Sequence, residues 1–433
     1  MRGQWRGPLS RVVGIFLLSA TLAQRAAAQA GICTWCPPVL PRWAPTYFLN
    51  ESTILEPCNR TGFLTPADVA GYAVVQLDWS GARMGPDGWA AARPMDPEER
   101  LLRQAALLKA AAPRQKVGVY KNMAWAMAWM TSVREKLSDP ALAHWFLRFA
   151  ATPPIANKSY WQPPCDNTEG KPICSQLYHA QTQSPGYPPA PGNDGNCSAP
   201  GCDCGGSVPC GAYLWDYRVP AVRDFVAQEY ILGATGAGNE NVSIVYLDDH
   251  WSNATDPTDA PDCASSPIGG PTEINVHCIA DMSLTQADTT AITAGFRETM
   301  LTVQAGLIAA GKFSWAFFTP IYGAPTPKGC VNWFREEAPP LAGRALMMGF
   351  SKSPALALED VATFLLVRGP YAYLGWGWLH CLQPPPLPAL VHGDYGVPAG
   401  NLTEGPPGVF TRAWSKADVA FDCNAYVATI TPR

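Results

Sequence analysis

The sequence predicts an α/β protein of the (β/α)8 TIM-barrel type, with Cys/Pro-rich loop insertions and a short antiparallel β tail at its C-terminus. Strand-like and helix-like stretches alternate about seven times, a pattern typical of a parallel sheet covered by helices. Several strand-like runs are apolar throughout, as expected for strands buried on both faces. The length of 433 residues favours a barrel with one poorly visible strand. An open doubly wound sheet is the alternative, but neither a G-x-G-x-x-G after the first strand nor a G-x-x-x-x-G-K-[ST] motif occurs.

Residues 1–30 have the features of a signal peptide, so we expect a secreted, extracellular protein. The start is basic, the apolar stretch Val12–Ala23 is too short to span a bilayer, and Ala28-Gln29-Ala30 matches a signal peptidase site. All 14 cysteines follow this segment, which predicts disulfides. Seven glycosylation sequons fit the same route, at Asn50, Asn59, Asn157, Asn196, Asn241, Asn253 and Asn401.

The mature chain is expected to contain three further regions. Residues 31–70 form a Cys- and Pro-rich lead-in, and residues 71–400 form the barrel. A long, irregular, disulfide-rich insert at 152–210 interrupts the barrel, and a segment of this length inside a domain is usually functional. Residues 401–433 form the β tail, with antiparallel strands on either side of Ser415-Lys416.

A β-α-β unit is visible at the start of the barrel region. Asp96, Pro97 and the acids that follow predict a helix start, and the helix runs to about residue 112 between strands at 72–77 and 116–120. Further elements follow in order: a helix from Asp139 to Phe149, a strand at 213–215, a helix from Pro220, a strand at 243–247, a helix at about 286–310, strands at 313–318 and 344–350, a helix at 354–368 and a strand at 371–378.

The central candidate site is Asp248-Asp249, which ends the apolar run Ile244–Leu247. Two adjacent acids at the end of a buried strand are costly unless they have partners or carry out chemistry. In parallel α/β folds the C-terminal ends of the strands carry the active site. We therefore interpret these acids as a catalytic centre; the alternative is that they cap a helix or brace a loop.

Three other strand ends carry charged residues, namely Asp78, Lys121 and Asp216. If all four strand ends share one rim, three carboxylates surround one ammonium group, which suits acid/base or nucleophilic chemistry on a neutral polar substrate. A buried ion network that only closes the barrel end is the alternative. Lys121 and its neighbour Asn122 are assigned to substrate binding.

Side-chain alternation along the strands indicates which acid faces the site. Asp248 shares parity with Tyr246, and Asp78 shares parity with Gln76, a polar residue poorly suited to the layer between sheet and helices. We therefore expect Asp248 to face the interior as nucleophile or charge-stabilising carboxylate. Asp216, expected one strand away and so about 5 Å across the sheet, is the first choice of acid/base, and Asp249 is expected to brace the loop or to bind a sugar hydroxyl.

Aromatic side chains beside the strand ends suit the C–H faces of sugars. Trp79 and Trp251 flank acids, and His250 lies between Asp249 and Trp251. We assign these three residues, with Trp376 and Trp378, to substrate binding. Trp125 and Trp129 are better explained as core residues.

Several segments of the chain together resemble a family of secreted, mostly uncharacterised proteins that is similar to glycoside-hydrolase-like barrels. The quoted pieces are Tyr120-Lys-Asn122, Asp216-Tyr-Arg-Val-Pro-Ala-Val-Arg223, Leu247-Asp-Asp249 and Val409-Phe-Thr-Arg-Ala-Trp414, and the resemblance covers most of the mature chain. It implies a TIM-type barrel with a sugar-directed site at the C-terminal strand ends, and hence hydrolysis of glycosidic bonds in an oligo- or polysaccharide.

One departure from this pattern keeps a second function open. Many retaining barrel hydrolases supply an acid from a later strand, but the strand 344–350 ends in Gly349-Phe-Ser-Lys352 without a carboxylate. A non-catalytic carbohydrate-binding or wall-associated protein is therefore the alternative, and a metal-dependent hydrolase using Asp248, Asp249 and His250 is a third. We expect no metal and no cofactor.

The charge balance also bears on the partners. Removal of residues 1–30, which hold four arginines and no acids, changes the formal net charge from −4 to −8, which argues against nucleic acid. No later stretch has the length of apolar sequence that a membrane span needs. The oligomeric state stays open.

Overall fold

The structure is a computed structural model, and it describes these residues: 36, 39, 52–55, 64–79, 81, 88–89, 92–147, 179–180, 208, 212–248, 250–251, 273–274, 285–314, 316–318, 326–339, 343–344, 346–350, 354–376 and 386–433. Most of the insert at 152–210 and all of residues 1–30 lie outside them, and so does the expected signal peptide.

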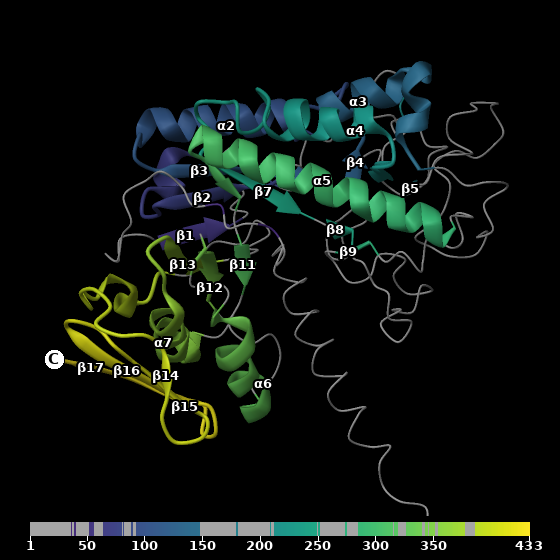
Figure 1. The fold of residues 1–433 in the computed structure, drawn as a ribbon. Helices are drawn as coiled ribbons and strands as arrows, with labels where there is room; N and C mark the ends of the chain where they lie inside the picture. Colours follow the sequence, from purple (N-terminus) through teal and green to yellow (C-terminus); the bar gives the residue numbers. More distant parts are fainter. Residues whose placement is uncertain are drawn as a thin grey trace, which may run out of the picture.

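A parallel sheet of eight strand segments organises the molecule (Figure 1). Its order is β10-β7-β3-β2-β1-β13-β12-β11, and every neighbouring pair is parallel. The apolar runs form these strands because both of their faces are covered. The segments are β1 (Ser52–Leu55), β2 (Val74–Leu77), β3 (Lys116–Asn122), β7 (Ile244–Asp248), β10 (Phe313–Ser314), β11 (Ala316–Phe318), β12 (Leu346–Gly349) and β13 (Ala372–Trp376).

The two edge segments of this sheet, β10 and β11, are consecutive in the chain. Phe313 of β10 pairs with Ile244 of β7, whereas Phe317 of β11 pairs with Met347 of β12. The same stretch of chain, 313–318, therefore supplies both edges of the sheet.

Helices cover the sheet on the side where α2 and α5 lie in Figure 1. Helix α2 begins where the sequence predicts, but the Asp96 side chain does not cap it and instead pairs with Arg100 at 2.8 Å. Thr285 and Asp288 form a capping box at the start of α5, and Gly311 ends that helix at a φ of 67°. The helices here are α2 (Pro97–Ala111), α3 (Thr131–Ser138), α4 (Pro220–Asp224) with its π-helical continuation η5 (Phe225–Ile231), and α5 (Gln286–Ala310).

The structure corrects two expectations about the strands. β1 pairs with both β13 and β2, so the parallel sheet already begins within the segment 31–70 that was expected to precede the barrel. The strand expected at 213–215 is β6 (Ala212–Leu214), and it leaves the parallel sheet to pair antiparallel with β4 (Trp125–Met127) and β5 (His179–Ala180). β6 cannot lie between β3 and β7 in the parallel sheet, because β3 and β7 pair directly with each other over five residues.

The C-terminal region is a four-stranded antiparallel sheet packed on helix α7 (Ala357–Val367), and helix α6 (Pro327–Asn332) precedes the aromatic Phe334 that packs on the sheet. The Cys330–Cys423 disulfide joins α6 to this sheet. Arg412 donates to the backbone carbonyl oxygens of Leu365, Leu366 and Arg368 at the end of α7, where carbonyl oxygens have no acceptor role within the helix. The strands are β14 (Thr403–Glu404), β15 (Val409–Ala413), β16 (Ala417–Asp422) and β17 (Val427–Pro432).

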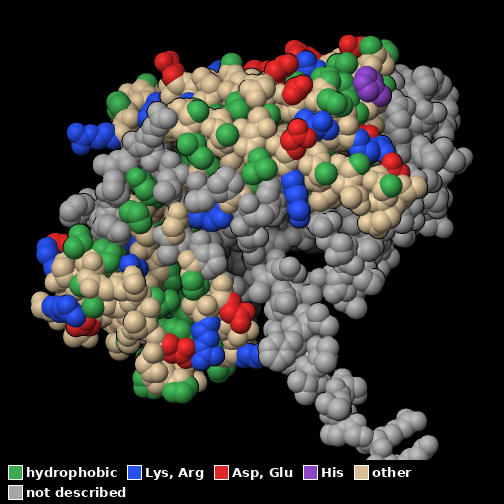
Figure 2. Space-filling model, in the orientation of Figure 1, with side chains coloured by type: hydrophobic (Ala, Val, Ile, Leu, Met, Phe, Trp, Pro, Cys, Tyr) green, Lys and Arg blue, Asp and Glu red, His purple; other side chains and the backbone are tan. Residues whose placement is uncertain are grey.

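The remaining elements are short: η1 (Pro66–Val69), η3 (Pro140–Trp145), β8 (His250–Trp251), β9 (Glu273–Ile274), η8 (Trp333–Glu337), η10 (Pro354–Leu356) and η11 (Ala389–His392). Seen from one side, positive and negative side chains are interspersed over the surface of the described residues (Figure 2). Among the described helices none is long and apolar enough to cross a membrane.

We predict that Gly118→Ala destabilises the protein by about 1–3 kcal/mol. A Cβ at this position would lie 1.9 Å from Oε1 of Gln76 and 3.2 Å from the Cβ of Ile244 on the neighbouring strands. Urea unfolding measures the loss. The control is Gly118→Ala/Gln76→Ala, whose destabilisation should be smaller than the sum of the two single changes. Wild-type stability in Gly118→Ala would contradict the strand register.

A second prediction concerns acid stability. Arg335 donates two hydrogen bonds to Glu404, at 2.8 and 2.6 Å, and lowers the pKa of that carboxyl from 4.5 to about 2. A depressed folded-state pKa contributes stability that is present above pH 4.5 and is lost as the pH falls toward 2. Melting temperatures across this pH range should therefore fall less steeply for Glu404→Gln than for the wild type. Because the pair is exposed, the difference should shrink in high salt, and parallel curves for the two proteins would refute the assignment.

Candidate active site around Asp248

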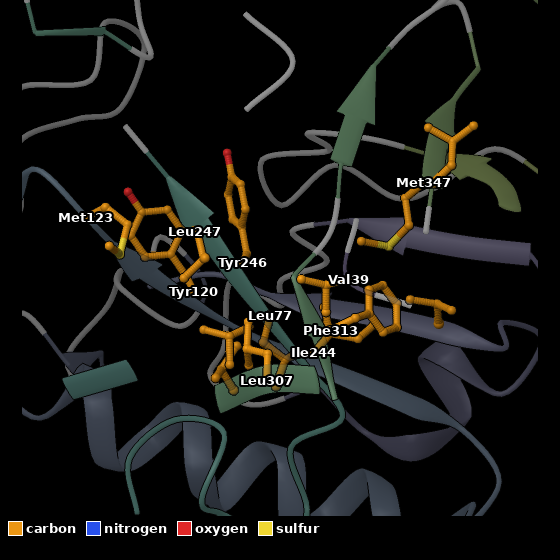
Figure 3. Packing of buried hydrophobic residues seen from close by; sticks show 14 of the residues in the cluster. Val39, Leu77, Tyr120, Met123, Ile244, Tyr246, Leu247, Leu307, Phe313 and Met347 are labelled. Carbon is orange, nitrogen blue, oxygen red and sulfur yellow. The ribbon is translucent and has the colours of Figure 1, made fainter. Parts of the chain in front are cut away.

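Asp248 lies at the C-terminal end of β7, and both of its carboxylate oxygens accept hydrogen bonds from tyrosines. The Tyr120 hydroxyl on β3 donates to Oδ2 at 2.6 Å, and the Tyr246 hydroxyl on β7 donates to Oδ1 at 2.9 Å. The two rings meet edge to face with centroids 5.3 Å apart. They rise side by side from neighbouring strands in Figure 3. The donors that orient this carboxylate are thus rigid aromatic side chains.

Asn122 supports this arrangement from the end of β3. Its amide nitrogen donates to the Tyr120 hydroxyl at 2.8 Å, which leaves the hydroxyl hydrogen directed at Asp248. Its carbonyl oxygen accepts from the backbone N–H groups of Ala124 and Trp125. The Met123 N–H donates to the Asp248 carbonyl oxygen at 2.8 Å. Asn122 therefore fixes the turn after β3 and the Tyr120 hydroxyl together.

Strand register shows which residues share the face of Asp248. Asn122 pairs with Asp248, Tyr120 with Tyr246, and Gly118 with both Gln76 and Ile244. Because alternate residues point to the same face, Gln76 and Tyr246 lie on one side of the sheet, as the sequence predicts. Val245 and Leu247 lie on the opposite side, where Leu247 pairs with Lys121.

Asp78 directly follows β2 and has the parity of Gln76, so it continues the same face. It is 7% exposed, and the pairing of Leu77 with Val119 sets it beside Tyr120 in the next row. Asp78 is thus separated from β7 by β3, a distance of about 10 Å across the sheet. The structure places two of the four candidate catalytic carboxylates, Asp78 and Asp248, on one face.

A cluster of aromatic rings adjoins Tyr120. The Trp79 ring lies 6.4 Å from Tyr120, 4.9 Å from Trp129 and 6.1 Å from Trp89, and the Trp89 indole N–H donates to the Trp79 carbonyl oxygen. Trp129 is 2% exposed, in keeping with the expected core role, whereas Trp79 is only partly buried. Trp79 is therefore the member of this cluster best placed to contact a ligand.

Lys121 does not join the carboxylates. It lies on the opposite face of β3, toward the helices, and its ammonium pairs with Glu98 of α2 at 2.6 Å. Both side chains are almost completely buried, with 2% and 4% of their surfaces exposed. The assignment of Lys121 to substrate binding is therefore not supported by its position, and the cause is the alternation of side chains along β3.

Asp216 does not end a strand next to β7 in the parallel sheet, because β6 belongs to the antiparallel sheet. Its carboxylate is held by the guanidinium of Arg218 at 2.7 Å, and the same guanidinium binds Asp288 at 2.5 Å. The Asp288 pKa is lowered by hydrogen bonds from Thr285 and from Arg218. A cavity of about 470 Å³ adjoins this group, lined by Pro140, Ala141, Ala143, His144, Phe146, Asp216 and Arg218. The expected spacing of one strand between Asp216 and Asp248 is therefore wrong.

The other assigned residues divide between buried positions and positions outside the described residues. Trp251 is 4% exposed. Trp376 is 7% exposed, and its ring lies 4.9 Å from Phe350 on the face opposite Asp248. Asp249, Trp378 and the side chain of His250 lie outside the described residues. Among the residues that are described, no group of three metal-ligating side chains occurs.

Sequence reasoning missed the two tyrosines and Glu98. Tyr120 lies two positions before Asn122, and Tyr246 lies two positions before Asp248. Each tyrosine therefore shares a strand face with a candidate residue, and this is the signal that could have identified it. Glu98 was assigned to the start of a helix, and nothing in its local sequence indicates a partner on β3.

No protein-family profile and no curated protein sequence matches the chain. Solved structures match it with low scores. A sucrose 6F-phosphate phosphorylase from Thermoanaerobacter thermosaccharolyticum is 10% identical, with 89% of this chain and 96% of that chain covered and a TM-score of 0.42. An alpha-glucosyl transfer enzyme, XgtA, is 11% identical, with 88% and 92% covered and a TM-score of 0.44. A cyclic alpha-maltosyl-(1→6)-maltose hydrolase from Arthrobacter globiformis is 10% identical, with 87% and 91% covered and a TM-score of 0.38. Scores of this size do not establish a shared fold, so the fold described above rests on strand register.

We predict that Tyr120→Phe and Tyr246→Phe each lower the free energy of unfolding by about 1–3 kcal/mol. Each change removes one phenol donor and leaves a partly buried carboxylate oxygen without that hydrogen bond. Denaturant titration measures the loss. In the Asp248→Asn background each Tyr→Phe change should have a smaller effect, because a neutral amide forms weaker hydrogen bonds than a carboxylate. Equal effects in both backgrounds would contradict the contacts described here.

Proposed function

We propose that the protein is a secreted, glycoside hydrolase-like enzyme that acts on oligo- or polysaccharide, with Asp248 as its central carboxylate. The observation that carries the proposal is the position of Asp248 at the C-terminal end of a parallel strand, with a phenol hydroxyl on each oxygen. The sequence resemblance to glycoside-hydrolase-like barrels and the features of residues 1–30 support the same function and the secretory route.

The proposed chemistry follows from the donors. Hydrogen bonds from hydroxyl groups favour the ionised carboxylate and fix its two oxygens in space. Such a carboxylate can stabilise the positive charge that develops on a sugar ring as a glycosidic bond breaks, or can attack the anomeric carbon. The partly buried Trp79, next to Tyr120, offers a flat apolar surface to the sugar.

We propose Asp78 as the second carboxylate. It continues the face of Gln76, and β3 alone separates its strand from β7. A retaining enzyme holds its two carboxyl groups about 5 Å apart, whereas an inverting enzyme leaves roughly 6.5–9.5 Å for a water molecule. The separation of two strands, about 10 Å, is nearer to the inverting arrangement.

The proposal includes a barrel closed through residues 313–318. Support comes from the pairing of β10 with β7 and of β11 with β12, which lie at the two ends of the strand order. Closure gives Asp248, Asp78 and the tyrosines an interior, so that ligand would enter from the C-terminal ends of the strands.

A non-catalytic carbohydrate-binding protein is the second candidate. The surroundings of Asp216 favour it, because the acid/base preferred on sequence grounds is held by Arg218 in a different sheet. A binding protein would keep the aromatic surface and the oriented carboxylate but lack the proton donor.

We predict that Asp248→Asn abolishes hydrolysis of aryl glycosides while the fold is kept, with a loss of about 10³-fold or more in kcat. Asp78→Asn should lose activity mainly on substrates with poor leaving groups, because these need a general acid. Screening the purified mature protein against a panel of aryl glycosides measures this, and nuclear magnetic resonance of the first-formed anomer reports inversion or retention. Asp216→Asn and Asp249→Asn serve as comparisons and should lose less.

Two results would change the proposal. Full activity in Asp248→Asn with loss in Asp249→Asn would transfer the role to the neighbouring acid. Binding of oligosaccharides in calorimetry, without turnover of any glycoside, would establish the binding protein in place of the enzyme.

A further inference from the structure

The buried ion pair behind β3 joins three elements that surround the site. Glu98 lies in the first turn of α2, and its Oε1 accepts from Nζ of Lys121 at the end of β3. The Ser132 hydroxyl donates to Oε1 and the Ser132 N–H to Oε2, both at 2.8 Å, which ties the start of α3 to the same carboxylate. Residues 123–130, which carry β4 and Trp129, run between these two anchoring points.

Lys121 is enclosed on its remaining sides. Its ammonium lies 3.1 Å from the Thr235 hydroxyl and 4.1 Å from the centre of the Tyr230 ring. Burial would raise the pKa of Glu98, but Lys121 and Ser132 lower it below its ordinary value, so the carboxylate is ionised at neutral pH. Burial lowers the pKa of Lys121, and the carboxylate of Glu98 opposes this shift. With that carboxylate, a hydroxyl and a ring around it, the lysine tip is held in place.

The position of Lys121 determines where its two neighbours point. Side chains alternate along a strand, so anchoring Lys121 toward the helices directs Tyr120 and Asn122 to the opposite face. Both residues are needed there, because Tyr120 donates to Asp248 and Asn122 donates to Tyr120. A twist or a shift of one residue at the end of β3 would remove both contacts.

We propose that the Lys121–Glu98 ion pair is a positioning device that holds the end of β3 in the orientation in which Tyr120 and Asn122 meet Asp248. Lys121 and Glu98 are positioning residues and touch no substrate. Buried ion pairs often add little net stability over apolar side chains of similar volume, whereas their geometry is directional. The effect of this ion pair on catalysis rests on the proposed function, whereas its effect on the orientation of the end of β3 does not.

The test uses the full mature chain with the double change Lys121→Met/Glu98→Gln, which removes both charges and keeps similar volumes. Hydrogen–deuterium exchange reports the amides of Met123, Ala124 and Trp125, which donate to Asp248 and Asn122. We expect these amides to exchange about tenfold faster than in the wild type, while the global unfolding midpoint is retained. Exchange at the wild-type rate in a stably folded double variant would overturn the proposal.

Two further variants keep the outcome decisive. Lys109→Met removes another partly buried lysine, whose ammonium binds the Pro113 and Gln115 carbonyl oxygens at the end of α2, and it should leave the exchange of residues 123–125 unchanged. If the double variant fails to fold, Glu98→Asp decides, because it keeps the charge but shortens the reach to Lys121. Unchanged exchange in Glu98→Asp would then refute the positioning role, and faster exchange would support it.

Kinetics separate this inference from the proposed function. If the wild type hydrolyses an aryl glycoside, the double variant should show a kcat lowered about tenfold with KM nearly unchanged, since only the orientation of Asp248 is affected. If the wild type hydrolyses no glycoside, the proposed enzyme activity fails, while the exchange measurement still tests the ion pair.

Discussion

The pairing of β3 with β7 is the interaction on which the candidate site depends. Five consecutive residue pairs set Tyr120 beside Tyr246 and Asn122 beside Asp248. These side chains come from positions more than a hundred residues apart in the chain. The backbone hydrogen bonds of the sheet bring them so close that only the side-chain rotamers remain to be set for the contacts to form. Shifting β7 by one residue against β3 would exchange Asp248 for Leu247 on the site face and turn Tyr246 toward the helices, away from Tyr120.

Strand alternation gives charged residues at neighbouring strand ends different environments. Lys121 is next in sequence to Tyr120 but faces the helices, where Glu98, Thr235 and Tyr230 surround it. Asp248 faces the other side and receives two phenol hydroxyls. A charge at a strand end is thus not evidence of a site until its face is known.

The sequence was sufficient for what depends on local pattern. Most of the helices and strands, and the common face of Gln76 and Tyr246, follow from apolar periodicity and parity. It was not sufficient for what depends on pairing over long distances. The run 212–214 is too short to show whether it joins a parallel or an antiparallel sheet, so Asp216 was placed beside Asp248. The strand Ser52–Leu55 was not recognised because it lies in a Cys- and Pro-rich segment, and its partners are the distant β13 and the following β2. The Glu98–Lys121 contact joins helix to strand through side chains alone, for which no local signal exists.

The two acids that the sequence ranked highest differ in the side chains that bind them. Asp216 is bound by the guanidinium of Arg218, which it shares with Asp288. A substrate that used the Asp216 carboxylate would have to displace the Arg218 guanidinium, which contacts both of its oxygens. Asp248 is oriented by phenol hydroxyls, which supply hydrogen bonds without a full positive charge. An oriented carboxylate at the C-terminal end of a parallel strand can act on a substrate in which positive charge develops, and this position directs attention to Asp248.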